Sequence, residues 1–515
     1  MSRNGMIIFK PFFVQQGRGP HLSDLVYTVD EHNDTFLSGI GLTEEGVAIS
    51  DTKGQKRFSV YVRWNVEGYG FLFMPADNNG EGYELPHNGI NRYHLNYELA
   101  KTRVKLSGDR LQLFESEGWR PSRTVKSYMD LSRTYLEDAE NVKSDPQACA
   151  YYSQQALMFG LLAGELIAFE KAQSDIRKST PRSQFYFGCD TRAFFQMDQK
   201  LFFEKFTSLF NYATITHYLI GDAIDFEPQE GHKRFIERSH LCDELMRRNI
   251  TVEGRPLFWT HSWVTPEWLA KKNFEALKLY LEKHIRNVVG YYGDRIKVWE
   301  VVNELHDWAN ELQLNPDQCV EITRFACEVA HDANPNIRLL INNCCPFAEY
   351  VQLGKWHQKK ALYPQRTPLQ FLRTLLEADV DFDIIGAQVY FVNRPIADVI
   401  SMIERFEGLG RQVHLAEVGA PSRGILQEFH EQELDFSTKP YEWRRHWDEE
   451  LQADWMEQIF TYAYSRPNIE AANWYDFLDP FGFLKYGGLL RRDTFEPKAA
   501  FDRLQRLQQQ LCKSE

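Results

Sequence analysis

The sequence predicts an α/β protein in which a (β/α)8 TIM barrel follows an N-terminal β-sandwich and a helical linker. Short apolar runs recur eight times from residue 185 onward, and amphipathic helical patterns fill most gaps between them. Upstream of these runs, alternating apolar and polar residues are frequent. Strands separated by helices indicate βαβ units, whereas alternation at period two indicates half-buried strands. We therefore expect a sandwich over 1–122, a linker over 123–180 and a barrel over 181–512.

Size and composition allow such an arrangement and exclude some partners. The chain has 515 residues, more than one hydrophobic core usually serves. Hydrophobic residues make up 43% and aromatic residues 14%, which is enough for a large core and for rings that stack on a ligand. The net charge of −13 argues against a nucleic-acid partner, because such proteins concentrate basic charge.

Neither a membrane span nor a cofactor is expected. No stretch reaches the ~20 apolar residues that cross a bilayer. The start, "MSRNGMIIFKPFFVQQG", is a poor signal peptide, so a cytoplasmic location is the default expectation. The eight cysteines follow neither a zinc spacing nor a dense disulfide framework. His217 and Asp222 lack a third ligand at a sensible spacing, so no metal site is predicted.

The N-terminal part contains the clearest strand patterns. Residues 57–66, "RFSVYVRWNV", alternate in polarity, and 69–76, "YGFLFMPA", follow a Glu-Gly turn. Residues 102–116, "TRVKLSGDRLQLFES", read as a hairpin whose turn is Ser107-Gly108-Asp109. Residues 123–178 then carry helical spacing with few breakers, which predicts two helices.

Eight apolar runs define the expected barrel strands, and they are nearly continuous, as expected of strands buried on both faces. They are 185–190, 213–219, 255–260, 296–304, 338–343, 384–391, 412–419 and 471–477. The helical pattern before the last run places Leu451, Trp455 and Ile459 on one face. Eight strand–helix units in this length are typical of a TIM barrel.

Two carboxylates stand out because they lie at or near strand ends, where TIM barrels place their active sites. Glu304 ends the fourth run and Glu417 nearly ends the seventh. Two facing carboxylates suit glycosidic bond cleavage: one protonates the leaving oxygen, and the other attacks the sugar or activates water. Asn303 is placed to hydrogen-bond a sugar hydroxyl, whereas Glu300 is interpreted as structural.

Over residues 185–510 the sequence resembles glycoside hydrolase family 10, the xylanase family of retaining (β/α)8 glycosidases. The resemblance rests on an ordered set of motifs, not on one of them. The matching segments are "VWEVVNE" (298–304), "HLAEVG" (414–419), "LFWTHSWVTPEWL" (257–269), "DFEPQEG" (225–231), "NWYDFLDP" (473–480), "GGLLRRD" (487–493) and "EPKAAFDRL" (496–504). The N-terminal sandwich is similar, on this view, to the carbohydrate-binding modules that often precede such barrels.

The resemblance implies a retaining hydrolysis of xylan-like polysaccharide, with Glu304 as general acid/base and Glu417 as nucleophile. Retention predicts carboxyl groups about 5–5.5 Å apart. No cofactor is implied, the partner is a carbohydrate, and the oligomeric state stays open. The residues expected to contact substrate are Asn303, Tyr390, Trp474, His261, Gln388, Trp259, Trp263, His217 and Arg255.

Several positions depart from the family pattern. The basic side chain that grips the sugar after strand two is missing, and His217, Tyr218 and Asp222 lie in that neighbourhood. Arg255 stands near the place of a strand-three His, and Tyr390 replaces a strand-six His. We expect Tyr390 to donate its hydroxyl to Glu417 and so to orient it.

Two alternatives follow from these departures. One alternative is a glycosidase for another β-linked or decorated glycan, and the other is a non-catalytic carbohydrate-binding protein on a decayed barrel. Endo or exo action, and carbohydrate binding by the first domain, are not decided by the sequence. The long segment 420–446 follows Glu417 and is expected to shape the glycone side or form a lid.

Overall fold

The computed structural model describes residues 5–12, 25–306, 309–356, 359–424, 442–480 and 483–512. The N-terminal part holds two four-stranded sheets. The first runs β4 (Ile40–Thr43), β5 (Gly46–Ile49), β1 (Met6–Lys10) and β8 (Ile90–His94). The second runs β3 (Thr35–Phe36), β2 (Val26–Val29), β6 (Ser59–Val66) and β7 (Gly70–Ala76). N-terminal sheets are thus present as predicted, and the exact domain limits stay a prediction.

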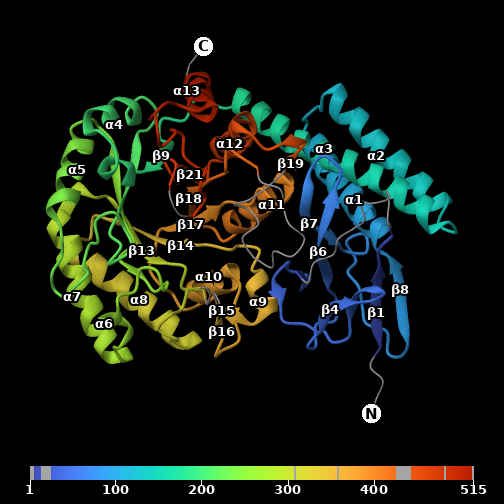
Figure 1. The fold of residues 1–515 in the computed structure, drawn as a ribbon, viewed down its shortest axis with the longest axis horizontal. Helices are drawn as coiled ribbons and strands as arrows, with labels where there is room; N and C mark the ends of the chain where they lie inside the picture. Colours follow the sequence, from blue (N-terminus) through green and yellow to red (C-terminus); the bar gives the residue numbers. More distant parts are fainter. Residues whose placement is uncertain are drawn as a thin grey trace.

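Three helices follow the sheets and lie side by side (Figure 1). They are α1 (Leu95–Ser116), α2 (Arg123–Asn141) and α3 (Pro146–Lys178). The two helices expected between 123 and 178 are therefore present. The hairpin expected at 102–116 is wrong, because these residues form most of α1.

Tertiary packing explains why Ser107 and Gly108 do not make a turn. Ser107 lies inside α1 and donates its hydroxyl to the backbone oxygen of Gly160 on α3, at 2.9 Å. A Cβ atom on Gly164 of α3 would lie only 2.9 Å from the Ser107 hydroxyl oxygen. Small residues on both helices thus allow a close approach. The resulting packing outweighs the weak helix propensity of Ser and Gly.

The second half of the chain forms the predicted closed barrel of parallel strands. The eight main strands are β9 (Tyr186–Asp190), β10 (Tyr212–Thr216), β11 (Thr251–Arg255), β13 (Val298–Asn303), β14 (Arg338–Asn343), β17 (Ile384–Val389), β18 (Gln412–Val418) and β21 (Ile469–Trp474). Neighbours along the chain pair in parallel, β21 pairs with β9, and β11 pairs with β13, which closes the ring. The short β12 (Phe258–Trp259) also pairs with β13.

Helices surround the barrel (Figure 1). The longer ones are α4 (Gln199–Phe206), α5 (Ile236–Met246), α7 (Phe274–Tyr292), α8 (Pro316–Ala333), α10 (Pro368–Glu377), α11 (Ile396–Glu407), α12 (Glu449–Ser465) and α13 (Ala499–Cys512). Short elements add α6 (Glu267–Ala270), α9 (Glu349–Leu353), β15 (Lys355–Trp356), β16 (Lys359–Lys360), β19 (Glu442–Trp443) and β20 (Arg445–His446). None of the described helices is long and apolar enough to cross a membrane.

Strand three begins earlier than predicted, at Thr251 instead of Arg255. Its sequence, "TVEGR", carries charged residues that an apolar pattern does not capture. Glu253 is fully buried and accepts a 2.6 Å hydrogen bond from the Tyr212 hydroxyl. The pairing of Tyr212 with Glu253 satisfies a polar group inside the barrel, so this strand does not need to be apolar.

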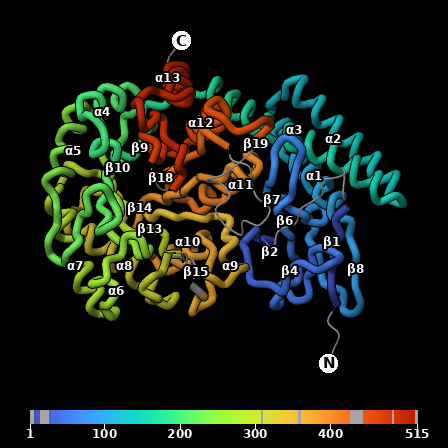
Figure 2. The backbone as a smooth tube through the Cα atoms, viewed as in Figure 1, coloured from blue at the N-terminus to red at the C-terminus, as the bar shows by residue number. Residues whose placement is uncertain are grey.

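Charged contacts fix the N-terminal part to the barrel. Arg103 of α1 forms two hydrogen bonds with Asp398 of α11, at 2.8 and 2.6 Å. Asp34, beside β3, accepts hydrogen bonds from Arg373 at 2.6 Å and Arg405 at 2.8 Å. Figure 2 shows the N-terminal sheets lying against the segment around α9.

A buried arginine reinforces the same junction. The guanidinium of Arg394, which follows β17, donates to the Tyr27 hydroxyl at 2.6 Å and pairs with Glu349 of α9. Its central carbon lies 4.2 Å from the ring centre of Phe73 and 4.0 Å from that of Phe347. Cation–π contacts gain strength when water is excluded. The N-terminal part therefore packs onto the barrel and is not a separate module on a tether.

We expect Arg103→Ala to lower the free energy of unfolding by about 3 kcal/mol, because the substitution leaves Asp398 without its partner at a largely buried position. Urea unfolding followed by tryptophan fluorescence measures the change. Lys105→Ala is the control, since Lys105 forms an exposed pair with Asp109 on the same helix. Equal losses for both variants would contradict a structural role for the Arg103–Asp398 pair.

Candidate active site

Local strand irregularities lie next to the two predicted carboxylates at the carboxyl end of the barrel. Between Glu300 and Val302, β13 carries one more residue than β14. Between the partners of Gly386 and Gln388, β18 carries one more residue than β17, and the next pair joins Gln388 to Glu417. Bulges of this kind re-aim side chains. They end the regular pleat just before Glu304 and Glu417.

Glu304 occupies an unusual backbone conformation and a neutral environment. Its φ of 56° lies in the left-handed region, which costs a residue other than glycine free energy. Its carboxyl oxygens accept hydrogen bonds from the indole of Trp259 at 2.9 Å and from the amide of Gln388 at 2.8 Å. Burial, aided by the negative charge of Glu417, raises the pKa of Glu304 to about 7. Near neutral pH this carboxyl group can therefore hold or release a proton.

Glu417 is held by different donors. One oxygen accepts from the Tyr390 hydroxyl at 2.5 Å, as predicted from the sequence. The other accepts from the guanidinium of Arg255 and from the amide of Asn342, the latter at 3.1 Å. A guanidinium, a phenol and an amide thus donate to the two oxygens of this carboxyl group. They also fix its direction, which an attacking group needs.

Glu300 lies on the inner side of Glu417 and shares its partners. It is fully buried and accepts from Asn342 at 2.9 Å, while the Nε of Arg255 lies 3.7 Å away. Burial raises the pKa of Glu300 well above its ordinary value. The Arg255 guanidinium lies closer to Glu417 than to Glu300. The interpretation of Glu300 as a structural residue agrees with this position.

Several predicted substrate contacts lie beside Glu304. Trp259 and Gln388 bind its carboxyl group, and Gln388 also reaches Asn303 at 3.4 Å. His261 lies 5.4 Å from the Trp259 ring and 4.8 Å from the ring of Trp263, measured between centroids. Trp263 is 60% exposed. Sugar contact by these residues stays a prediction.

Three other predicted contacts need correction. Trp474 is fully buried and donates its indole hydrogen to the backbone oxygen of Gly487, so no face is open to a sugar. His217 is also buried, and its two ring nitrogens are bonded to the Ile215 carbonyl and the Tyr292 hydroxyl. Arg255 is 1% exposed and contacts carboxylates instead of substrate. All three side chains are buried, and other parts of the barrel supply their hydrogen-bond or ion-pair partners.

Two aromatic residues that the sequence did not single out lie near Glu417. Tyr475, directly after β21, and Phe483 are partly exposed. Their rings meet Tyr390 edge to face, with centroids 5.4 and 5.1 Å away. The sequence signal was present, since Tyr475 neighbours Trp474. Successive residues point to opposite sides of a strand. Trp474 is therefore buried, whereas Tyr475 contacts Tyr390 at the carboxyl end of the barrel.

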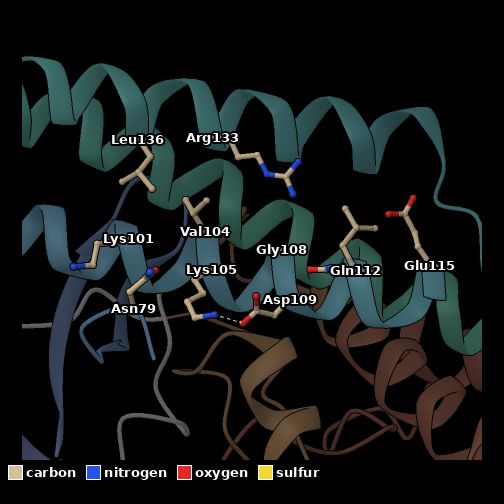
Figure 3. A pocket seen from close by; sticks show the side chains of 11 residues that line it. Asn79, Lys101, Val104, Lys105, Gly108, Asp109, Gln112, Glu115, Arg133 and Leu136 are labelled. Carbon is tan, nitrogen blue, oxygen red and sulfur yellow. Dashed lines mark hydrogen bonds and ion pairs between the residues drawn. The ribbon is translucent and has the colours of Figure 1, made fainter. Parts of the chain in front are cut away.

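A separate cavity and the arrangement of potential metal ligands give no further candidate active site among the described residues. A cavity of about 490 Å³ lies between α1 and α2, but no aromatic ring lines it (Figure 3). Within the described part of the chain, no group of three His, Cys, Asp or Glu residues is arranged to hold a metal ion. Residues 425–441, most of the segment expected to shape the glycone side, lie outside the described residues.

Residues 182–506 match the family model of glycosyl hydrolase family 10. The chain belongs to this family. It is therefore a glycosidase, as the sequence predicted, and the barrel described above is its family 10 region. The paired carboxylates lie on β13 and β18 of that region.

Curated relatives of this family 10 protein are distant. Endo-1,4-beta-xylanase B from Paenibacillus barcinonensis is 26% identical over 275 residues, which cover 50% of this chain and 75% of the relative. Endo-1,4-beta-xylanase B from Thermotoga neapolitana is 23% identical over 308 residues, covering 56% and 76%. The crystal structure of xylanase 10B from Thermotoga petrophila RKU-1 in complex with xylobiose superposes with a TM-score of 0.46 at 19% identity, covering 67% of this chain and 98% of that one.

We expect the carboxyl group of Glu304 to titrate near pH 7, far above an ordinary glutamate, because burial disfavours its charged form. The infrared difference between wild type and Glu304→Gln, followed from pH 5 to pH 9, measures this titration. A protonated-carboxyl band should disappear with a midpoint of about 7. Glu137→Gln, on the exposed side of α2, should leave that transition intact. A midpoint near 4 would contradict the neutral environment of Glu304.

Proposed function

We propose that this family 10 protein hydrolyses a xylan-like β-1,4-linked polysaccharide by double displacement. The proposal is carried by one observation: the two carboxyl groups have opposite environments. Neutral donors surround Glu304, whereas a guanidinium and a phenol hold Glu417. Environments that separate two carboxyl groups in this way assign one as acid and the other as nucleophile.

In the first step, protonated Glu304 gives its proton to the glycosidic oxygen while Glu417 attacks the anomeric carbon. The bond to the leaving sugar breaks, and a glycosyl ester forms on Glu417. In the second step, ionised Glu304 takes a proton from water, whose oxygen displaces Glu417. The sugar leaves with its original configuration, and both carboxyl groups return to their starting states.

The residues around the pair support these steps. Trp259 and Gln388 fix the Glu304 carboxyl group by hydrogen bonds. Burial and the charge of Glu417 outweigh these bonds and raise the pKa of Glu304 to about 7, so the proton is retained near neutral pH. Tyr390 and Arg255 orient Glu417, and Arg255 offsets its charge in a buried place. Asn342 joins Glu417 to Glu300 and limits rotation of both side chains.

The xylan assignment is supported by the relatives, which carry the name endo-1,4-beta-xylanase. A different β-linked glycan is the second candidate, and one observation favours it. Asp222, in the segment where the family carries a sugar-gripping base, is buried and accepts from Thr216 at 2.8 Å. Arg238 lies 3.6 Å from the same carboxylate. This segment therefore offers no free cation to a sugar.

A polysaccharide panel tests both candidates. Purified protein should release oligosaccharides from xylan, and nuclear magnetic resonance should show the β-anomer first. Release from β-glucan or β-mannan but not from xylan would favour the second candidate. First appearance of the α-anomer would contradict double displacement. Binding without turnover on every polysaccharide would support the non-catalytic alternative.

Variants of the two carboxylates separate their roles. Glu417→Ala should abolish turnover of xylan and of aryl β-glycosides, since no ester can form. Glu304→Ala should lower turnover of xylan by about 10²–10⁴-fold, because a sugar leaving group needs a proton. Turnover of a nitrophenyl glycoside should fall less in its first step, since nitrophenolate leaves without one. Circular dichroism serves as the folding control, and wild-type rates in folded Glu417→Ala would refute the nucleophile.

The pH dependence follows from the raised pKa of Glu304. The first step needs its protonated form, so kcat/KM should fall as pH rises through about 7 and approach a tenfold loss per pH unit above it. Below pH 7 this group imposes no loss. The measurement is kcat/KM on a xylo-oligosaccharide between pH 5 and pH 9. A basic limb that is unchanged in Glu304→Ala would contradict the assignment.

A further inference from the structure

Three charged side chains at the carboxyl ends of the first and last strands have no part in the mechanism above. Arg192, two residues after β9, donates from Nε to Asp190 at 2.7 Å and from Nη2 to Asp476 at 3.0 Å. Asp190 ends β9, and Asp476 lies two residues after β21. These strands pair in the barrel, so Arg192 connects neighbouring loops.

The group connects to Glu417 through two aromatic side chains, Tyr475 and Tyr390. The central carbon of the Arg192 guanidinium is 4.7 Å from the ring centre of Tyr475, and that of Arg255 is 5.9 Å from the same ring. Tyr475 also meets Tyr390, whose hydroxyl binds Glu417. One phenol ring thus lies close to both guanidinium groups. Arg192 is on the side of the proposed nucleophile, where the sugar that forms the ester must lie.

Hydrogen-bonding capacity in this group is left unused. The second carboxylate oxygens of Asp190 and Asp476 are buried and have no partner among the described residues. The side chain of Arg192 is 20% exposed, and its Nη1 makes no hydrogen bond to any residue that the structure describes. Unsatisfied buried acceptors are costly and call for an explanation.

A purely structural link between the loops does not account for this arrangement. One aspartate would suffice to pair Arg192, and the arrangement leaves two carboxylate oxygens without a donor among the described residues. A sugar hydroxyl supplies what is missing, because it accepts one hydrogen bond and donates another. It can accept from Nη1 and donate to a carboxylate.

The charges of these three side chains also indicate the charge of the ligand. Two carboxylates face one guanidinium, so an acidic sugar would meet repulsion. Burial raises the pKa of Asp476 to about 7, which reduces this negative charge near neutral pH but does not make the group positive. A neutral sugar needs no counter-charge and gains the hydrogen bonds.

We propose that Arg192, Asp190 and Asp476 form a subsite for the hydroxyl groups of a neutral sugar residue on the glycone side of the cleaved bond. This inference rests on the proposed function and deepens it by naming the residues that bind the sugar on the glycone side. The glycan carries no uronic acid at this position. Arg192 takes the place of a cation that the segment around Asp222 does not offer.

The test measures binding separately from turnover. In a Glu304→Gln background, which should bind without efficient hydrolysis, calorimetry follows the affinity for xylotetraose and cellotetraose. Adding Arg192→Ala should weaken binding of the preferred tetrasaccharide by roughly tenfold to a hundredfold, since hydrogen bonds to a charged donor are lost. Arg503→Ala is the matched control: Arg503 pairs with Asp454 and Glu457, and its side chain is 22% exposed.

A second variant guards against misfolding of Arg192→Ala. Asp476→Asn keeps its shape and an oxygen for Arg192, but it replaces the unused acceptor by a donor. It should weaken the same tetrasaccharide severalfold while the urea midpoint stays unchanged. Unaltered affinity in Asp476→Asn, together with unaltered affinity in folded Arg192→Ala, would overturn the subsite.

Two further outcomes would also overturn it. One is tighter binding of a glucuronic-acid-bearing xylo-oligosaccharide that Arg192→Ala removes, which would show an acidic ligand. The other is failure of the Arg192-intact protein to bind either tetrasaccharide. The polysaccharide panel then shows whether the catalytic assignment fails as well, because product release by wild type does not depend on this subsite proposal.

Discussion

The guanidinium of Arg255 is the contact on which the proposed chemistry depends. It is buried between two carboxyl groups, Glu417 and Glu300, inside the carboxyl end of the barrel. A lone charge at this depth would be costly, and its removal would leave two acidic groups with no cation between them. Burial raises the pKa of Glu300 well above its ordinary value, and the Arg255 guanidinium lies closer to Glu417 than to Glu300. The side chain of Glu417 is thus held in one orientation by donors from three other segments.

The same constraint explains why the barrel interior is polar in places. Glu253, Glu300 and Glu417 come from three strands. Glu253 and Glu300 each find a donor on a neighbouring strand, and Glu417 finds one on β14, beyond the neighbouring β17. A strand that carries an inward-facing charge does not look like a buried strand in the sequence. The barrel tolerates these residues because a hydrogen bond or ion pair to each carboxyl group offsets part of the free energy lost when that group is removed from water.

The N-terminal part packs against the outside of the barrel. Arg103 and Arg394 bind it to α11 and to the segment around α9, so its sheets and the barrel share one packed boundary. A flexible binding module would need few contacts of this kind. Within the barrel, the pairing of β9 with β21 brings Arg192 to Asp476.

The sequence by itself determined the barrel, its strand order and the two carboxylates, because apolar runs and polar strand ends are local patterns. It also predicted that Tyr390 donates to Glu417. Tertiary structure decided the rest. Packing against Gly160 made a helix around Ser107, and pairing inside the barrel placed Arg255 on Glu417. Packing buried Trp474 and His217, so neither is open to a sugar. A long-range hydrogen bond joined Arg192 to Asp476. Such contacts depend on where distant segments meet, and no local pattern records that.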